Sequence, residues 1–198
     1  PHALQRAPNR TSADTEMEQH RVNSEEIKTR FGSYHVHVLE QDQTSRLANL
    51  YSTHDGVAIC RTLAVTRFSQ PISATLKEAD THIRAGQSLG NTLQQAGLLM
   101  SREVIVEATT PCGQQFSTLC GQTVPLASPV YLRVYRLHAG AQPQFLAPYA
   151  IIAEAHHPEH TAVHAGLMPL SDIDASQWEP DTKWAVDALT RALSSDQL

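Results

Sequence analysis

Residues 46–68 read RLANLYSTHDGVAICRTLAVTRF. Two strand-like runs flank the His-Asp-Gly tripeptide at 54–56, and Asp-Gly between such runs is a strong signal for a tight β-hairpin. The second run has a two-residue period whose apolar positions are Val57, Ile59, Leu63 and Val65. Arg61 falls on the same face of that period. These residues predict two antiparallel neighbouring strands.

Further strand-like runs lie on both sides of this hairpin. Residues 31–41, FGSYHVHVLEQ, alternate between one face with Tyr34, Val36 and Val38 and another with His35, His37 and Leu39. Three later runs, residues 102–108, 130–137 and 149–157, also read as strands. The sequence therefore predicts a single antiparallel sheet of about six strands.

Helical patterns occupy the remaining periodic segments. Residues 72–86 offer Ser73 as an N-cap and Gly86 as a stop, with Leu76, Ala79 and Ile83 on one face. A shorter helix is predicted between Ser88 and Gly97. Residues 181–193 carry an apolar stripe of Trp184, Ala188 and Ala192 beside Ala185, Leu189 and Leu193, which fits a docking helix. Strands interrupted by helices predict the α+β class.

The chain of 198 residues is long enough for one sizeable core. Residues 1–24 are polar and without period, so we expect an N-terminal tail followed by one domain over 25–198. A net charge of −5 with both signs interspersed argues against nucleic acid as a partner, and no apolar run approaches the ~20 residues that span a bilayer. A cleaved signal peptide would fit the start at Pro1, but the sequence indicates neither a compartment nor an oligomeric state.

Three cysteines are present, and they leave two alternatives open. Cys112 and Cys120 flank a predicted polar loop over residues 111–129, where they could form a disulfide or remain unbonded thiols. Cys60 lies in a strand-like run and is expected to be a buried small hydrophobe. The spacing in CGQQFSTLC does not match zinc-ligand motifs.

A carboxylate stands in the last predicted strand, within PYAIIAEAHHPEH (residues 148–160). Glu154 shares a strand face with Ile152 and His156, and a buried carboxylate needs a partner. Arg46, Arg61 and Arg133 are the candidates. Glu154 could instead belong to a structural ion pair or face solvent at the sheet edge.

The order of these motifs resembles the chorismate lyase family. The resemblance rests on HVHVLEQ, the hairpin over HDG, CRTLAV, GQSLGNTL, YRL and IIAEAHHP, and it covers most of residues 31–160. Two motif positions depart from the family: Ser88 stands where the family has Pro, and Ala153 where it has Thr.

The resemblance implies a six-stranded antiparallel sheet with flanking helices and an internal ligand cavity. Chorismate lyase eliminates pyruvate from chorismate, leaving 4-hydroxybenzoate, without a metal or an organic cofactor. Glu154 matches the family's catalytic glutamate, and Leu89-Gly90 match its pocket Leu-Gly. The family's arginine, which binds the ligand carboxylate, falls at Ala48 or at Arg46 depending on the end of the hairpin from which it is counted. Arg61 matches the arginine of an Arg-Thr element.

The expected partner is therefore a small-molecule carboxylate. Glu154 and Arg46 are the predicted catalytic residues, and the other predicted ligand-binding residues are Arg61, Leu89, Gly90, His35, His37 and His156. A non-catalytic sensor or carrier of the same fold is the first alternative. The second is a metal-binding protein that uses His156, His157, His160 and His164, although Pro158 opposes a continuous helix there.

Overall fold

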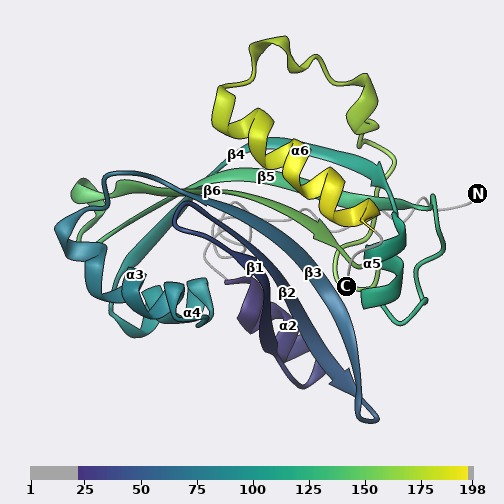
Figure 1. Ribbon diagram of the computed structural model, residues 1–198, viewed down its shortest axis with the longest axis horizontal. Coiled ribbons are helices and arrows are strands. Elements are labelled where there is room, and N and C mark those ends of the chain that lie inside the picture. The colour runs from purple at the N-terminus through teal and green to yellow at the C-terminus, as the bar shows by residue number, and fades with distance from the viewer. Residues whose placement is uncertain (1–21, 196–198) are drawn as a thin grey trace, which may run out of the picture.

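A computed structural model describes residues 22–195 of the protein. Its centre is one antiparallel sheet of six strands in the order β1-β2-β3-β6-β5-β4 (Figure 1). The strands are β1 His35–Gln41, β2 Ser45–His54, β3 Val57–Phe68, β4 Leu99–Pro111, β5 Pro129–Gly140 and β6 Ala147–His156. The predicted α+β class and the strand number are confirmed.

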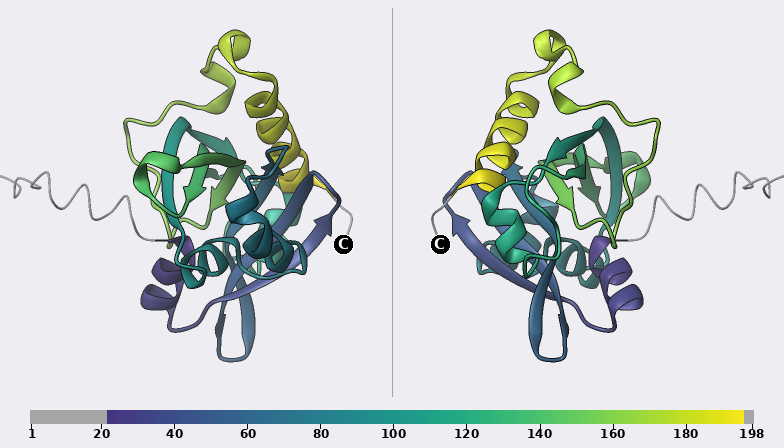
Figure 2. Two further views of the ribbon diagram at one scale, coloured as in Figure 1. Left: turned by 90° about the vertical axis from the view of Figure 1, so that its left-hand side faces the viewer. Right: turned by 90° about the vertical axis from the view of Figure 1, so that its right-hand side faces the viewer.

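The predicted hairpin joins β2 and β3, and its turn lies at one end of the molecule (Figure 2). His54 pairs with Val57, so the loop consists of Asp55 and Gly56. Both residues have positive φ, 49° and 79°, as a type I′ turn requires. Because Asp tolerates and Gly favours this backbone region, the dipeptide fixes the position of the turn.

A β-bulge in β3 corrects one prediction. Leu50 pairs with Thr62 and Tyr51 pairs with Cys60, which leaves Arg61 as the extra residue of the bulge. The bulge shifts the side-chain alternation by one position, so Cys60 joins Leu63 in the apolar cluster. The prediction that Arg61 shares the face of that cluster was therefore wrong.

Helices cover both faces of the sheet (Figures 1 and 2). On one face, α5 (Gln114–Leu119) and α6 (Pro180–Ser194) enclose the larger apolar cluster with Ala153 and Ala155 of β6. On the other face, α2 (Asn23–Phe31), α3 (Lys77–Arg84) and α4 (Leu89–Gln95) lie against the strands. Ile152 of β6 belongs to the second cluster there, as expected from the alternation along a strand.

The three predicted helices are confirmed. Leu76, Ala79 and Ile83 are buried as expected, although Leu76 ends a short 3₁₀ turn, η1 (Ala74–Leu76), that precedes α3. In α6 the fully buried side of the stripe is Ala185, Leu189 and Leu193, while Trp184 and Ala188 are only partly buried. The C-terminal helix therefore packs on the sheet as predicted.

The segment predicted as a polar loop, residues 111–129, contains helix α5, so that prediction was wrong in part. The helix has only six residues, too few for a helical period to be recognised, and it is held by the fully buried Phe116. A Cβ at Gly113 would lie 2.2 Å from the Leu193 carbonyl oxygen, so glycine allows α6 to end against this turn. Cys112 and Cys120 are buried free thiols, as is Cys60.

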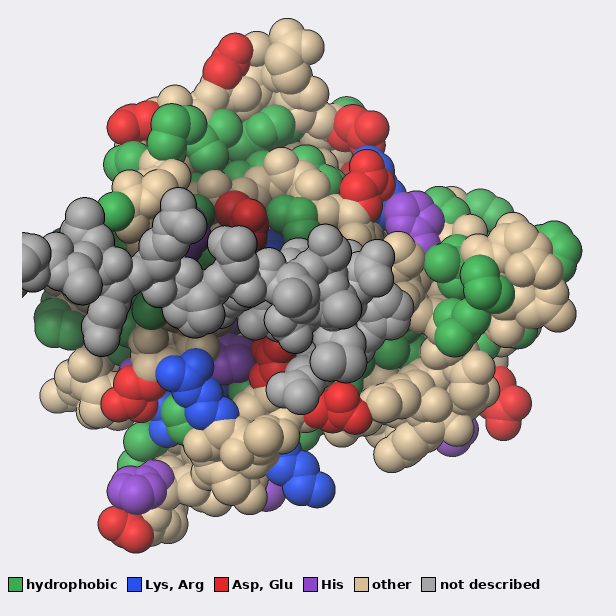
Figure 3. Space-filling model, turned by 180° about the vertical axis from the view of Figure 1, so that it is seen from behind, with side chains coloured by type: hydrophobic (Ala, Val, Ile, Leu, Met, Phe, Trp, Pro, Cys, Tyr) green, Lys and Arg blue, Asp and Glu red, His purple; other side chains and the backbone are tan. Residues whose placement is uncertain are grey.

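Three shorter elements complete the description: η2 (Pro143–Phe145), η3 (Leu170–Asp172) and η4 (Ala175–Gln177). Of the predicted tail, residues 1–21 lie outside the described part of the chain, while Val22 is the buried N-cap of α2 and Asn23 and Ser24 are buried residues of its first turn. Within residues 22–195, no helix combines the length and apolarity needed to cross a membrane. On the face seen in Figure 3, acidic side chains lie among apolar and basic ones.

Candidate functional site

A cavity lies between the sheet and helices α2 and α4. It has a volume of about 60 Å³. All six strands contribute side chains to the sheet wall, and the first residues of α2 and α4 form the opposite wall. Its larger polar side chains are Asn23, Tyr34, Arg46, Arg102, Tyr135 and Glu154, and its larger apolar ones are Leu50, Leu89, Met100, Leu137 and Ile152.

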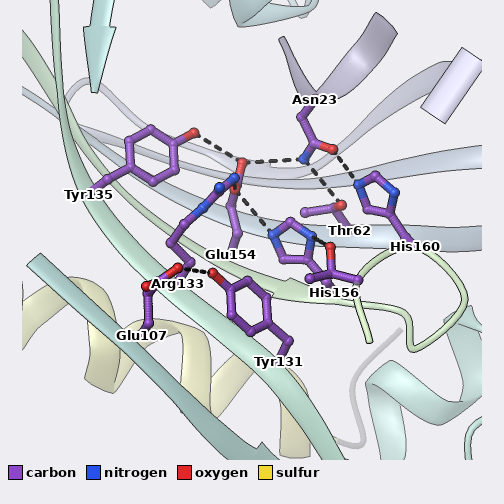
Figure 4. Close-up of polar contacts among 10 residues, drawn as sticks. Asn23, Thr62, Glu107, Tyr131, Arg133, Tyr135, Glu154, His156 and His160 are labelled. Atoms are coloured by element: carbon purple, nitrogen blue, oxygen red, sulfur yellow. Dashed lines mark hydrogen bonds and ion pairs between the residues drawn. The ribbon is translucent and has the colours of Figure 1, made fainter. Parts of the chain in front are cut away.

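Glu154 is buried at this cavity and is hydrogen-bonded on both oxygens (Figure 4). Its Oε2 accepts from Arg133 Nη2 at 2.9 Å and lies 3.3 Å from His156 Nε2. Its Oε1 accepts from the Tyr135 hydroxyl at 3.0 Å and from Asn23 Nδ2 at 3.4 Å. Four donors therefore surround one carboxylate, and the predicted need for an arginine partner is met by Arg133.

The charge state of Glu154 follows from these contacts. Burial by itself would raise the pKa of Glu154, but the hydrogen bond from His156 and the positive charge of Arg133 outweigh burial and hold the pKa well below its usual range. Glu154 is thus a carboxylate at neutral pH. In the unliganded protein it accepts hydrogen bonds and carries no proton to donate.

Two stacked histidines, His156 and His160, lie beside Glu154. The rings of His156 and His160 lie 5.2 Å apart at 11°, and His156 Nδ1 is 2.9 Å from the Thr161 hydroxyl. His160 Nε2 lies 2.7 Å from Asn23 Oδ1, an acceptor, so this nitrogen carries the proton. Burial lowers the pKa of both histidines, that of His160 to about 3. Both rings are therefore neutral at pH 7.

Arg46 lines the same cavity from β2, with 4% of the residue exposed. Its Nη1 donates to the main-chain oxygens of Ile83, at 3.1 Å, and Gln87, at 2.8 Å. None of the ion pairs formed among residues 22–195 includes Arg46. Burial lowers the pKa of this guanidinium, against the smaller opposing influence of Tyr34 and Tyr149. The cavity wall thus contains a buried cation without a carboxylate partner in this part of the chain.

The structure brings most of the predicted site together. Leu89 and Gly90 line the cavity with Arg46 and Glu154. Ala48, the other position at which the family's arginine could fall, also lines it, because residues two apart on a strand share a face.

The two departures from the family lie in different places. Ser88 lies at the cavity, where its hydroxyl bonds Tyr34 at 2.8 Å and makes no side-chain hydrogen bond to cap α4. Ala153 belongs to the apolar cluster on the opposite face of the sheet.

The structure places the other predicted residues outside the cavity. Arg61 stacks on Phe31 at 3.8 Å from the ring centroid and bonds Ser52 at 2.8 Å and Glu159 at 2.6 Å. His35 and His37 are exposed, because the opposite face of β1, with Tyr34 and Val36, is the one that lines the cavity. His156 does not line the cavity; it is buried behind Glu154, with its Nε2 3.3 Å from Glu154 Oε2.

Sequence reasoning missed several cavity residues, and the larger polar ones among them are Asn23, Tyr34, Arg102 and Tyr135. Asn23 belongs to the segment interpreted as a tail, and no pattern distinguishes it there. The signal for Tyr135 was the alternation of Tyr131, Arg133 and Tyr135, which puts three polar side chains on one face of β5.

The histidine cluster considered for a metal is dispersed. His156 and His160 are bound within the Glu154 network, His157 Nε2 lies 3.0 Å from the Thr123 hydroxyl, and His164 is exposed. In the part of the chain that the structure describes, no group of three or more His, Cys, Asp or Glu side chains is arranged to hold a metal ion.

Comparison with known proteins found no family model that matches the chain and no curated protein that matches it in sequence. The fold and the cavity define an α+β protein with an antiparallel sheet and a small internal site.

Proposed function

We propose that the protein binds a small aromatic or enol carboxylate in the cavity between Arg46 and Glu154, as the resemblance to chorismate lyases implies. The observation that carries this proposal is the burial of Arg46 at the cavity wall without an ion-paired carboxylate among the described residues.

A buried cation costs free energy unless an anion compensates it. Main-chain oxygens satisfy Nη1 of Arg46 but supply only partial charge. A ligand carboxylate would supply a full charge, in the two-pronged geometry that a guanidinium prefers. The side chains of Leu50, Leu137 and Ile152 would pack against an apolar ring or enol skeleton.

The other polar end of the cavity favours a hydrogen-bond donor. Glu154 is ionised, so it would repel a second carboxylate placed beside it and would accept from a hydroxyl group. A compound with a carboxylate at one end and a hydroxyl at the other, such as 4-hydroxybenzoate, fits this polarity.

Chorismate lyase activity would be the elimination of pyruvate from chorismate, with 4-hydroxybenzoate as the second product. A non-catalytic sensor or carrier is the second candidate. One observation favours the sensor or carrier. Four donors of the protein itself contact the Glu154 carboxylate, so this side chain accepts hydrogen bonds and is not arranged to transfer a proton.

Titration calorimetry with 4-hydroxybenzoate and with chorismate tests the proposal, with Glu154→Ala as the comparison. We expect the wild-type protein to bind 4-hydroxybenzoate and Glu154→Ala to bind it more weakly. Release of pyruvate from chorismate, followed with a coupled assay, separates a lyase from a sensor. Absence of binding to either compound by well-folded wild-type protein would refute the proposal.

A further inference from the structure

The carboxylate of Glu154 presents one oxygen to the cavity and the other to the protein interior. Arg133 and His156 contact Oε2, and neither of them lines the cavity. Tyr135 and Asn23 contact Oε1, and both line it. A carboxylate has about four lone-pair sites, so these four donors leave none free. A ligand that donates to Oε1 must therefore replace Tyr135 or Asn23.

Tyr135 is the more firmly held of the two. It lies in the middle of β5, is 4% exposed, and donates at 3.0 Å. Burial and the charge of Glu154 raise the pKa of Tyr135, so its hydroxyl remains protonated and stays a donor.

Asn23 is the weaker donor. Its contact with Oε1 is 3.4 Å, near the upper limit for a hydrogen bond, and the same Nδ2 donates to the Thr62 hydroxyl at 3.2 Å. It is the first residue of α2, and the N-cap residue before it, Val22, provides no side-chain hydrogen bond to the helix. Helix ends open more easily than helix centres.

The amide of Asn23 also connects two segments that surround the cavity. Its Oδ1 accepts from His160, in the turn after β6, and the His160 main-chain oxygen accepts from Arg30 of α2 at 2.8 Å. Val22 and Ser24, on either side of Asn23, line the cavity too. The first turn of α2 is thus a wall of the cavity, and it contacts the Glu154 carboxylate through the amide of Asn23.

We propose that Asn23 occupies the position of the ligand's hydrogen-bond donor at Glu154 Oε1, and that binding replaces its amide and moves the first turn of α2. This inference rests on the proposed function and identifies Asn23 as a specificity-determining residue. A carboxylate ligand with a distal hydroxyl or amino group displaces Asn23, whereas one without a distal donor leaves Asn23 in place.

Calorimetric titration of 4-hydroxybenzoate and of benzoate tests the inference in three proteins: wild type, Asn23→Ala and Glu25→Ala. Glu25 is in the same helical turn but is exposed and bonds Gln94, so it serves as the matched control. Because Asn23→Ala removes a competing hydrogen bond, we expect it to bind 4-hydroxybenzoate about fivefold more tightly. Benzoate binding should be unchanged, and Glu25→Ala should resemble wild type with both compounds.

Equal or weaker binding of 4-hydroxybenzoate by Asn23→Ala would overturn the inference while leaving the proposed function in place. If wild-type protein binds neither 4-hydroxybenzoate nor benzoate, both the inference and the proposed function are overturned. Hydrogen exchange on wild-type protein gives a readout that needs no variant. We expect amides of residues 22–26 to exchange faster with 4-hydroxybenzoate than with benzoate, and identical exchange would contradict displacement of Asn23.

Discussion

Replacing Glu154 with glutamine should destabilise the protein strongly. The variant keeps the side-chain shape but removes the charge and one acceptor oxygen, leaving Arg133 without its ion-pair partner. Removing one partner of a buried pair costs ~3–5 kcal/mol. Because the Arg133 side chain is 22% exposed and its partner 4%, water compensates part of this cost. We therefore expect a loss of about 3 kcal/mol in the free energy of unfolding.

Urea denaturation at pH 7, followed by circular dichroism, measures this loss. Glu103→Gln is the matched control, since Glu103 pairs with Arg136 at 2.8 Å but its side chain is 58% exposed. Exposed pairs contribute less than ~1 kcal/mol. Equal, small losses in the two variants would refute the reasoning that burial makes the Glu154 pair costly to break.

The difference in stability between wild type and Glu154→Gln should depend on pH. The pKa of Glu154 is lower in the folded protein than the ~4.3 expected of an unfolded chain. Its contribution to stability is therefore fully present above that unfolded value and is lost as the pH falls toward the folded pKa. The difference between wild type and Glu154→Gln should shrink below about pH 4.

Three further predictions concern other residues. The pKa of His160 is lowered, mainly by burial, from 6.5 to about 3, so the folded state loses stability as the pH falls from 6.5 toward 3. Urea denaturation at a series of pH values should therefore show a smaller loss of stability over this range for His160→Gln than for wild type. Gly90→Ala would put a Cβ 3.2 Å from Val22, so we expect faster hydrogen exchange in the first turn of α2, and unchanged exchange would contradict the close packing. Phe116→Ala should lower the free energy of unfolding by ~3–5 kcal/mol, because Phe116 is fully buried and anchors α5; a loss under ~1 kcal/mol would show that α5 is not anchored there.

The sequence predicted the sheet well because its signals are local. The alternation in residues 31–41, the Asp-Gly turn and the apolar run before Glu154 each depend on a few neighbouring residues. The bulge at Arg61 was not predictable in this way. It depends on how β3 pairs with β2, and it reversed the side of the sheet to which Arg61 was assigned.

The candidate site was predictable in part for the same reason. Arg46 and Glu154 come from strands whose faces could be assigned, given the resemblance. The choice between the two faces of β1 could not be made from alternation alone, so His35 and His37 were assigned to the cavity in place of Tyr34 and Val36. Asn23 reaches Glu154 across 131 positions of sequence, and only the packing of α2 on the sheet brings them together.

The most direct test of the account is the affinity of Arg46→Met for 4-hydroxybenzoate, measured by calorimetry beside Arg136→Met. Methionine keeps much of the apolar volume, while the charge and the hydrogen bonds to the main-chain oxygens of Ile83 and Gln87 are lost. Arg136, whose ion pairs with Glu103 and Glu179 lie outside the cavity, provides the matched loss of charge. We predict ~10- to 100-fold weaker binding for Arg46→Met and wild-type binding for Arg136→Met. Wild-type affinity in Arg46→Met would contradict the claim that this buried guanidinium binds the ligand carboxylate.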